Sequence, residues 1–230
     1  MTSKERVRLT IEHRPVDRLA LDFHARDEVY AALQKRLGVA SHEEVERALG
    51  SDLRRVRPSH PGEVSGLRYS DPTVRITEDG LYRDIWGVGF RAGESGHGAY
   101  MDVADYPQKD AETMADLEKH AWPEAGDLDY STVLDQARRH GDKWVWFNAR
   151  GVFEVSWFIR GFENFMMDLA AEPEKACYLM DAVLAYQKAR ARRMLAAGQG
   201  HIDMVEYNDD MGTQQNLLMS ADMWRQIIKP

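Results

Sequence analysis

Short apolar runs of strand length alternate along this chain with segments whose apolar residues recur every three or four positions. The apolar runs lie in the ranges 18–23, 143–151 and 201–210, and a brief strand is also expected at 51–58. In the segments between these ranges, the spacing of the apolar residues is typical of amphipathic helices. Strands that alternate with helices usually form parallel pairs joined by crossover helices. The pattern therefore predicts an α/β fold.

Capping residues mark the ends of several expected helices. Thr2 with Glu5 and Ser41 with Glu44 form capping-box patterns, and Gly38 follows a helical run as a C-cap residue. We expect helices in the ranges 2–14, 24–38, 41–50, 110–120, 129–141, 162–198 (broken at Pro173) and 220–230.

Helical periodicity disappears between residues about 58 and 106, where glycines and prolines become frequent. Inside this range, Asp79 and Gly80 lie between two runs of alternating apolar and polar residues. An Asp-Gly pair in that setting predicts a tight hairpin turn. We interpret 58–106 as a β-hairpin insertion within a single domain that covers residues 1–230.

Three of the predicted strands turn polar at their ends. The polar residues are Asp22 and His24 at the end of the first strand, 148–150 at the end of the third, and 206–210 at the end of the fourth. Active sites of (β/α) barrels are built from such carboxyl-terminal strand ends. A doubly wound sheet usually carries a glycine-rich phosphate loop after its first strand, but residues 21–27 contain no glycine. The pattern favours a barrel and does not support nucleotide binding.

The composition excludes several classes of protein. The chain has 230 residues, 43% of them hydrophobic, so it can bury a full core. Thirty basic and 38 acidic residues give a net charge of −8, which disfavours nucleic acid and anionic membranes as partners. Cys177 is the single cysteine, so disulfides within the chain and cysteine-based zinc sites are excluded. There is neither an apolar leader nor a run of 18 apolar residues, and we expect a cytoplasmic protein.

Three blocks of the sequence resemble the uroporphyrinogen decarboxylase superfamily, which includes corrinoid- and coenzyme M-linked methyltransferases. The blocks are 1–23, 152–198 and 205–230. The resemblance implies a TIM-type (β/α)8 barrel with its site in the mouth. It also implies that the strand near residue 205 is only about the middle of the barrel. We therefore expect an incomplete, N-terminal part of such a barrel, with four strands.

The first loop distinguishes between branches of this superfamily. The decarboxylase holds its substrate's carboxylates with several arginines in this loop, whereas this chain has only Arg26, among Asp22, Asp27 and Glu28. The resemblance thus favours the methyltransferase branch. It also places Asp52 near the catalytic aspartate of the decarboxylase. Trp157 and Asp209 stand where the decarboxylase has a tyrosine and a serine.

Cofactor expectations come from the same resemblance. The methyltransferases bind zinc through a His-x-Cys pair and a later cysteine, which would lie beyond residue 230, and their corrinoid is carried by a partner protein. We expect this chain alone to bind no metal or cofactor, and zinc and a partner's corrinoid to belong to the full-length enzyme. None of the eight histidines lies in an HxH or HExxH pattern.

The predicted site consists of the strand-end residues and two further positions. As catalytic residues we predict Asp209, Asp210 and Asp52. As substrate-binding residues we predict Asp22, His24, Arg26, Asn148, Arg150, Trp157, Glu206 and Asn208.

Each of these residues also has a purely structural interpretation. Asp209 and Asp210 could cap a helix. Arg150 could pair with Glu154 one helical turn later, and Trp157 could belong to the core.

Three functions follow as hypotheses. The first is methyl transfer between a small molecule and a corrinoid on a partner protein. The second is decarboxylation of uroporphyrinogen without a cofactor. The third is a non-catalytic half barrel that binds a corrinoid protein or another half. A half barrel leaves strand edges and an apolar face uncovered, so we also expect self-association.

Overall fold

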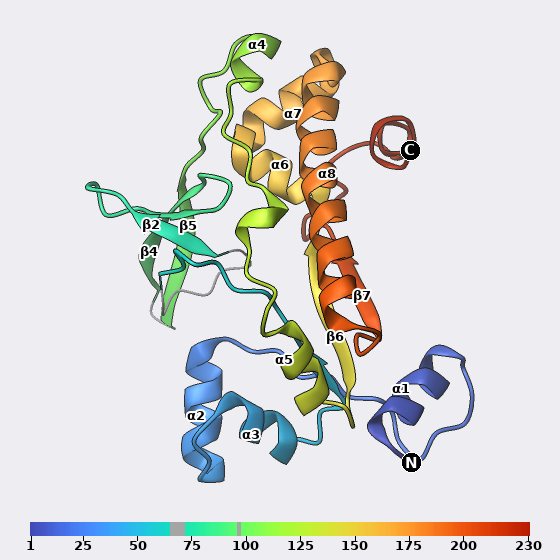
Figure 1. The fold of residues 1–230 in the computed structure, drawn as a ribbon. Helices are drawn as coiled ribbons and strands as arrows, with labels where there is room; N and C mark the ends of the chain where they lie inside the picture. Colours follow the sequence, from blue (N-terminus) through green and yellow to red (C-terminus); the bar gives the residue numbers. More distant parts are fainter. Residues whose placement is uncertain (65–71, 96–97) are drawn as a thin grey trace. The chain divides into compact units, whose positions relative to one another are not determined.

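The computed structural model describes residues 1–64, 72–95 and 98–230, whose elements are drawn in Figure 1. The chain divides into two compact units. Unit 1 consists of Met1–Arg57, Ser131–Phe147 and Met194–Val205. Unit 2 consists of Pro58–Tyr130, Asn148–Arg193 and Glu206–Pro230.

Unit 1 contains the N-terminal helices and the start of the main sheet. Both predicted capping boxes form, at Thr2 and at Ser41, and Gly38 has the left-handed conformation (φ 69°) that a C-cap requires. The elements of this unit are α1 (Ser3–Ile11), α2 (Asp27–Leu37), α3 (His42–Ala48), β1 (Leu53–Arg55) and α5 (Val133–Arg139).

The main sheet has the strand order β1-β6-β7, with β6 at Trp144–Arg150 and β7 at Met204–Asn208. β1 pairs with β6 in parallel, with Leu53 opposite Trp144. This confirms the α/β prediction and three of the four predicted strands, whereas the barrel stays a prediction. The described strands do not close into a barrel.

The predicted strand at 18–23 is wrong, because this segment has no regular structure. Its backbone bonds to one aspartate instead of to a neighbouring strand. The Leu21 N–H donates to Asp52 Oδ2 (3.0 Å), and the Leu21 carbonyl accepts from the Asp52 N–H (2.7 Å). Leu19 and Leu21 are exposed. An apolar run becomes a strand only where a ladder partner is present, and periodicity does not reveal that.

The insertion forms a four-stranded antiparallel sheet in unit 2, with the order β2-β3-β4-β5. The predicted hairpin turn lies between β2 and β3, where Gly80 has a φ of 77°. Parts of the predicted insertion, residues 65–71 and 96–97, lie outside the described residues. The strands are β2 (Thr73–Ile76), β3 (Tyr82–Asp84), β4 (Gly89–Ser95) and β5 (Gly98–Asp105).

The helices of unit 2 share one hydrophobic core with this sheet. Trp86, Val88 and Phe90 of the insertion belong to the same buried cluster as Phe153 and Phe165 of the helices. The long predicted helix ends as expected, at Pro173 and Gly198. The helices are α4 (Met114–Leu117), the 3-10 turn η1 (Ala125–Asp127), α6 (Val152–Arg160), α7 (Phe162–Ala171), α8 (Pro173–Gly198), α9 (Ala221–Met223) and the π-helical turn η2 (Trp224–Ile228).

Candidate functional site at the ends of β6 and β7

Polar side chains of β6 and β7 meet at the carboxyl ends of these two neighbouring strands. The Asn148 amide, which is almost wholly buried, donates to Glu206 Oε2 (2.7 Å) and to Asn208 Oδ1 (2.9 Å). Glu206 and Asn208 are two positions apart, so their side chains lie on one face of β7. The structure thus brings three predicted substrate-binding residues together. We call Asn148, Glu206 and Asn208 the β6–β7 cluster.

The Asp209 carboxylate caps helix α6 rather than its own turn. Oδ2 accepts from the Phe153 N–H (2.9 Å), and Oδ1 accepts from the Glu154 N–H (2.7 Å). The α6 N-cap residue is Gly151, which has no side chain to perform this task. Burial raises the pKa of Asp209, although these N–H bonds oppose the shift. This carboxylate therefore stabilises the first turn of α6.

Gly151 allows that carboxylate to approach. A Cβ atom at this position would lie 2.1 Å from Asp209 Cγ and 2.4 Å from the Asn208 carbonyl oxygen. Since the backbone conformation of Gly151 is ordinary (φ −63°), space and not φ explains the glycine. A glycine between the end of a buried strand and the start of a helix, as at Gly151, is the sequence signal that could have indicated this close approach.

Tyr207 is a second residue that the sequence analysis missed. Its hydroxyl donates to Asp209 Oδ2 (2.9 Å) and accepts from the Val152 N–H (3.3 Å). Burial of the hydroxyl, together with the Asp209 charge, raises the pKa of Tyr207 to about 12, so the phenol stays protonated at neutral pH. Tyr207 and Asp209 together fasten the end of β7 to the first turn of α6.

Asp210 differs from its neighbour. Its side chain is exposed, and no described residue bonds to it. Of the two adjacent aspartates, Asp209 is used by the fold and Asp210 is free to contact a ligand.

Arg150 and Trp157 are held by the interior of unit 2. Arg150 is buried, with Nη2 at 3.2 Å from Glu154 Oε2 and its guanidinium 5.2 Å from the centroid of the Phe158 ring. Trp157 packs against Phe158 and Phe162, with ring centroids at 4.0 and 5.6 Å. Both arrangements match the structural interpretation of these residues, and their roles in substrate binding stay predictions.

Three predicted substrate-binding residues belong to unit 1 and are exposed. They are Asp22, His24 and Arg26. The His24 ring contacts the Trp146 ring edge to face, with centroids 5.5 Å apart. Arg26 precedes α2 and supplies no side-chain cap. The β6–β7 cluster, by contrast, lies in unit 2.

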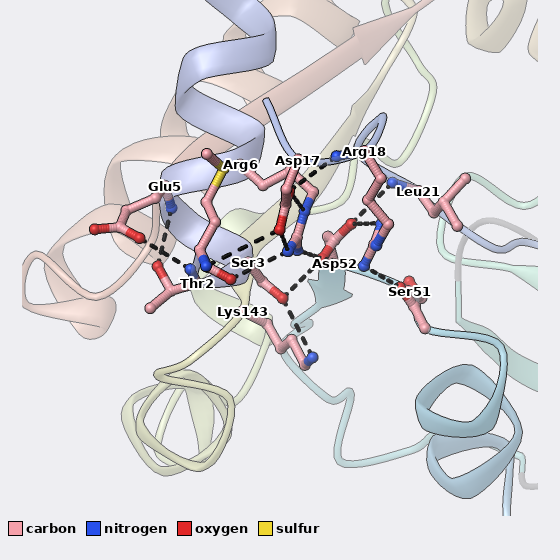
Figure 2. A network of polar contacts seen from close by, with 12 residues as sticks. Thr2, Ser3, Glu5, Arg6, Asp17, Arg18, Leu21, Ser51, Asp52 and Lys143 are labelled. Carbon is pink, nitrogen blue, oxygen red and sulfur yellow. Dashed lines mark hydrogen bonds and ion pairs between the residues drawn. The ribbon is translucent and has the colours of Figure 1, made fainter. Parts of the chain in front are cut away.

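Asp52 lies in a network of polar contacts, which Figure 2 shows. Its side chain is completely buried and forms ion pairs of 2.6 Å with both Arg6 and Arg18. Ser3 Oγ (2.8 Å) and the Leu21 N–H (3.0 Å) also donate to it. Burial alone would raise the pKa of Asp52, but the bonds from Arg18, Leu21 and Ser3 outweigh it and lower that pKa.

Its position in the sheet supports the same conclusion. Asp52 precedes β1, at the amino end of a parallel strand, and conserved chemistry in barrels is built at the opposite, carboxyl end. Since its acceptor oxygens are occupied and no part of the side chain is accessible, these contacts favour a structural role for Asp52, and its catalytic role stays a prediction.

Neither a metal centre nor a membrane span is found in the described part of the chain. Residues 1–64, 72–95 and 98–230 contain no group of three or more His, Cys, Asp or Glu side chains that could hold a metal ion. For a metal, the cysteine is also unsuited, because burial raises the pKa of Cys177 and so disfavours the thiolate form that metals bind. In the same ranges no helix is long and apolar enough to cross a membrane.

Comparisons with known proteins identify a similar fold. No family model matches the chain, and no curated protein matches it either. Among solved structures, a methyltransferase from Methanosarcina mazei is similar, with a TM-score of 0.59 at 17% sequence identity. The match covers 100% of this chain and 64% of that chain. The whole of this chain therefore has an α/β fold like that of 64% of the methyltransferase.

Proposed function

We propose that this protein acts as a methyltransferase, moving a methyl group between a small molecule and a corrinoid on a partner protein. The observation that carries the proposal is the β6–β7 cluster, because polar groups gather there at the carboxyl ends of neighbouring strands. The likeness in fold to a methyltransferase supports it. The chain spans 64% of the length of that protein, and the corrinoid partner is part of the proposal.

In this proposal the residues at the strand ends have different chemical roles. Glu206 and Asn208 have oxygen atoms that can accept hydrogen bonds from a small substrate and orient it. When a methyl group joins an acceptor that carries N–H, O–H or S–H, that acceptor loses a proton. We assign Asp210 to accept this proton, because its carboxylate is exposed and free. Asp209 and Tyr207 act as positioning residues, since they fix the backbone on either side of Asn208.

The steps proposed here use no zinc, and zinc in the full-length enzyme stays a prediction. The described residues offer no set of three ligands, and a catalytic zinc needs three protein ligands and an open position. A corrinoid would be carried by the partner protein and would supply or receive the methyl group.

The change in the visible spectrum from methylcobalamin to cob(I)alamin, followed without oxygen as the Co–C bond breaks, tests this function. We expect the purified chain to demethylate methylcobalamin in the presence of a small thiol or amine. Replacement of Asp210 with Asn should lower kcat about 100-fold, the usual scale for a lost general base. The matched control is Asp222→Asn, since Asp222 is an exposed carboxylate paired with Arg225 at 2.7 Å. No demethylation with any such acceptor, or equal losses in the two variants, would contradict the proposal.

No observation favours uroporphyrinogen decarboxylation. Its expected catalytic carboxylate, Asp52, is sealed inside unit 1, and Arg26 is the only arginine of the first loop.

Self-association is a separate proposal. β1 and β7 are the outer strands of the main sheet as described, and open strand edges promote pairing with another chain. Unit 1 also exposes apolar side chains at Leu19, Leu21, Val29 and Leu37. We expect two copies to associate at micromolar concentration in sedimentation-velocity experiments. A monodisperse monomer under these conditions would contradict this proposal and leave the catalytic one untouched.

A further inference from the structure

Unit 1 has a pocket that none of the predicted site residues lines. Its volume is about 300 Å³, at the lower end of the range for small-molecule sites. It lies between the side of α3, the end of α5 and the turn that leads into β6. The lining residues are Glu43, Arg47, Arg139, His140, Asp142 and Lys143.

The cations of this pocket are only loosely paired. Arg47 lies 3.5 Å from Glu43, and Lys143 lies 3.6 Å from Asp142, both longer than a normal charge-assisted hydrogen bond. Arg139 has no ion-pair or hydrogen-bond partner among the residues that the structure describes. Three permanent cations thus face the pocket without a close anion of their own.

The Glu43 carboxylate is partly compensated by a buried arginine. Its closest partner is Arg54, with Nε at 2.8 Å from Oε2, and the same Nε lies 3.2 Å from Glu46 Oε2. His140, mostly buried, lies 3.8 Å from the same oxygen, and burial lowers the pKa of His140. Because Arg54 is shared with Glu46, it reduces but does not cancel the repulsion between Glu43 and an incoming anion, and the attraction comes from Arg47, Arg139 and Lys143.

We propose that this pocket binds the phosphate group of a small ligand. Arginine forks match the geometry of phosphate oxygens, and lysine adds a mobile point charge. The protein as a whole carries a net charge of −8, so general attraction of anions to its surface does not explain binding here. The proposal is independent of the proposed methyl transfer, because no residue of the β6–β7 cluster takes part.

Helix stabilisation offers another role for Arg139. Arg138 and Arg139 both end α5, where cations interact favourably with the helix dipole. Arg138 shares this position and is likewise exposed, but it does not line the pocket. A comparison of the two neighbours therefore separates a binding role from a helical one.

Isothermal titration calorimetry with inorganic phosphate tests the proposal, at constant ionic strength and with chloride as the competing anion. We expect saturable binding that Arg139→Ala weakens about tenfold, as a lost charged bond to phosphate would, whereas Arg138→Ala changes it less than twofold. Circular dichroism checks that both variants fold. A second titration with glycerol 3-phosphate distinguishes a phosphate ester, which should bind more tightly, from free phosphate. Absence of saturable heat with either ligand, or equal effects of the two variants, would overturn the proposal.

Discussion

Asp52 and Asp209 both lie next to a strand end, yet their surroundings differ. Asp52 precedes β1 and is enclosed by two arginines, and the bonds from Arg18, Leu21 and Ser3 lower its pKa against the effect of burial. Asp209 follows β7 and, among the described residues, accepts from neutral donors, two N–H groups of α6 and the Tyr207 hydroxyl; burial raises its pKa, which these bonds and the Arg150 charge only partly oppose. The comparison teaches that the charge of the enclosing groups, more than position beside a strand, decides what a carboxylate can do.

The largest effect is expected from Asp52→Ala. This change leaves the buried Arg6 without its interior partner and removes the bond to Arg18, and breaking a buried pair in this way costs about 3–5 kcal/mol. Urea unfolding measures the loss in the free energy of unfolding. Glu12→Gln is the control, because Glu12 makes only long, exposed pairs with Arg8 and Arg14. A loss below about 1 kcal/mol would show that the Asp52 pair is not the anchor of unit 1.

Gly151→Ala should have an intermediate effect. The added methyl group must displace Asp209 or Asn208, and overpacking of this kind costs about 1–3 kcal/mol. Thermal unfolding and the amide exchange rates of Phe153 and Glu154 measure the change. Gly212→Ala provides the matched control, since a Cβ there meets only the Asn216 carbonyl oxygen at an ordinary 3.6 Å. Unchanged exchange of both amides would mean that Asp209 does not cap α6.

The smallest effect concerns pH and separates the two carboxylates by sign. The folded-state pKa of Asp52 is lowered, so its stabilisation is complete above the unfolded value of about 3.9 and is lost as pH falls through the folded pKa. The folded-state pKa of Asp209 is raised, so its contribution is present below about 3.9 and is lost as pH rises through the folded pKa.

Urea unfolding between pH 3 and 8 checks these signs with Asp52→Asn and Asp209→Asn. The difference between wild type and the Asp52 variant should shrink as the solution becomes acidic. As pH rises, wild type should instead lose free energy of unfolding relative to the Asp209 variant. Parallel curves for the two variants would remove the contrast between the two sites.

Local signals predicted much of the fold. The capping residues Thr2 and Ser41, the C-cap Gly38 and the Asp79-Gly80 turn each act through neighbours a few positions away. The apolar runs at 143–151 and 201–210 became strands because they are paired within the sheet. The run at 18–23 has similar composition, but its backbone bonds to Asp52 instead, and no window of sequence contains that information.

Part of the candidate site was predictable for the same reason. Polar residues that end neighbouring parallel strands converge whatever their exact geometry, and this placed Asn148 near Glu206 and Asn208. The division of work between Asp209 and Asp210 was not predictable, because it depends on where the first turn of α6 lies.

The sequence by itself determined the alternation of strands and helices, their caps, the hairpin in the insertion and the polar ends of β6 and β7. These depend on periodicity and on bonds between residues three or four positions apart. Only the tertiary structure decided which carboxylates are enclosed. Asp52 meets Arg6 across 46 positions and Asp209 meets Phe153 across 56, and contacts of that separation exist only once the chain has packed.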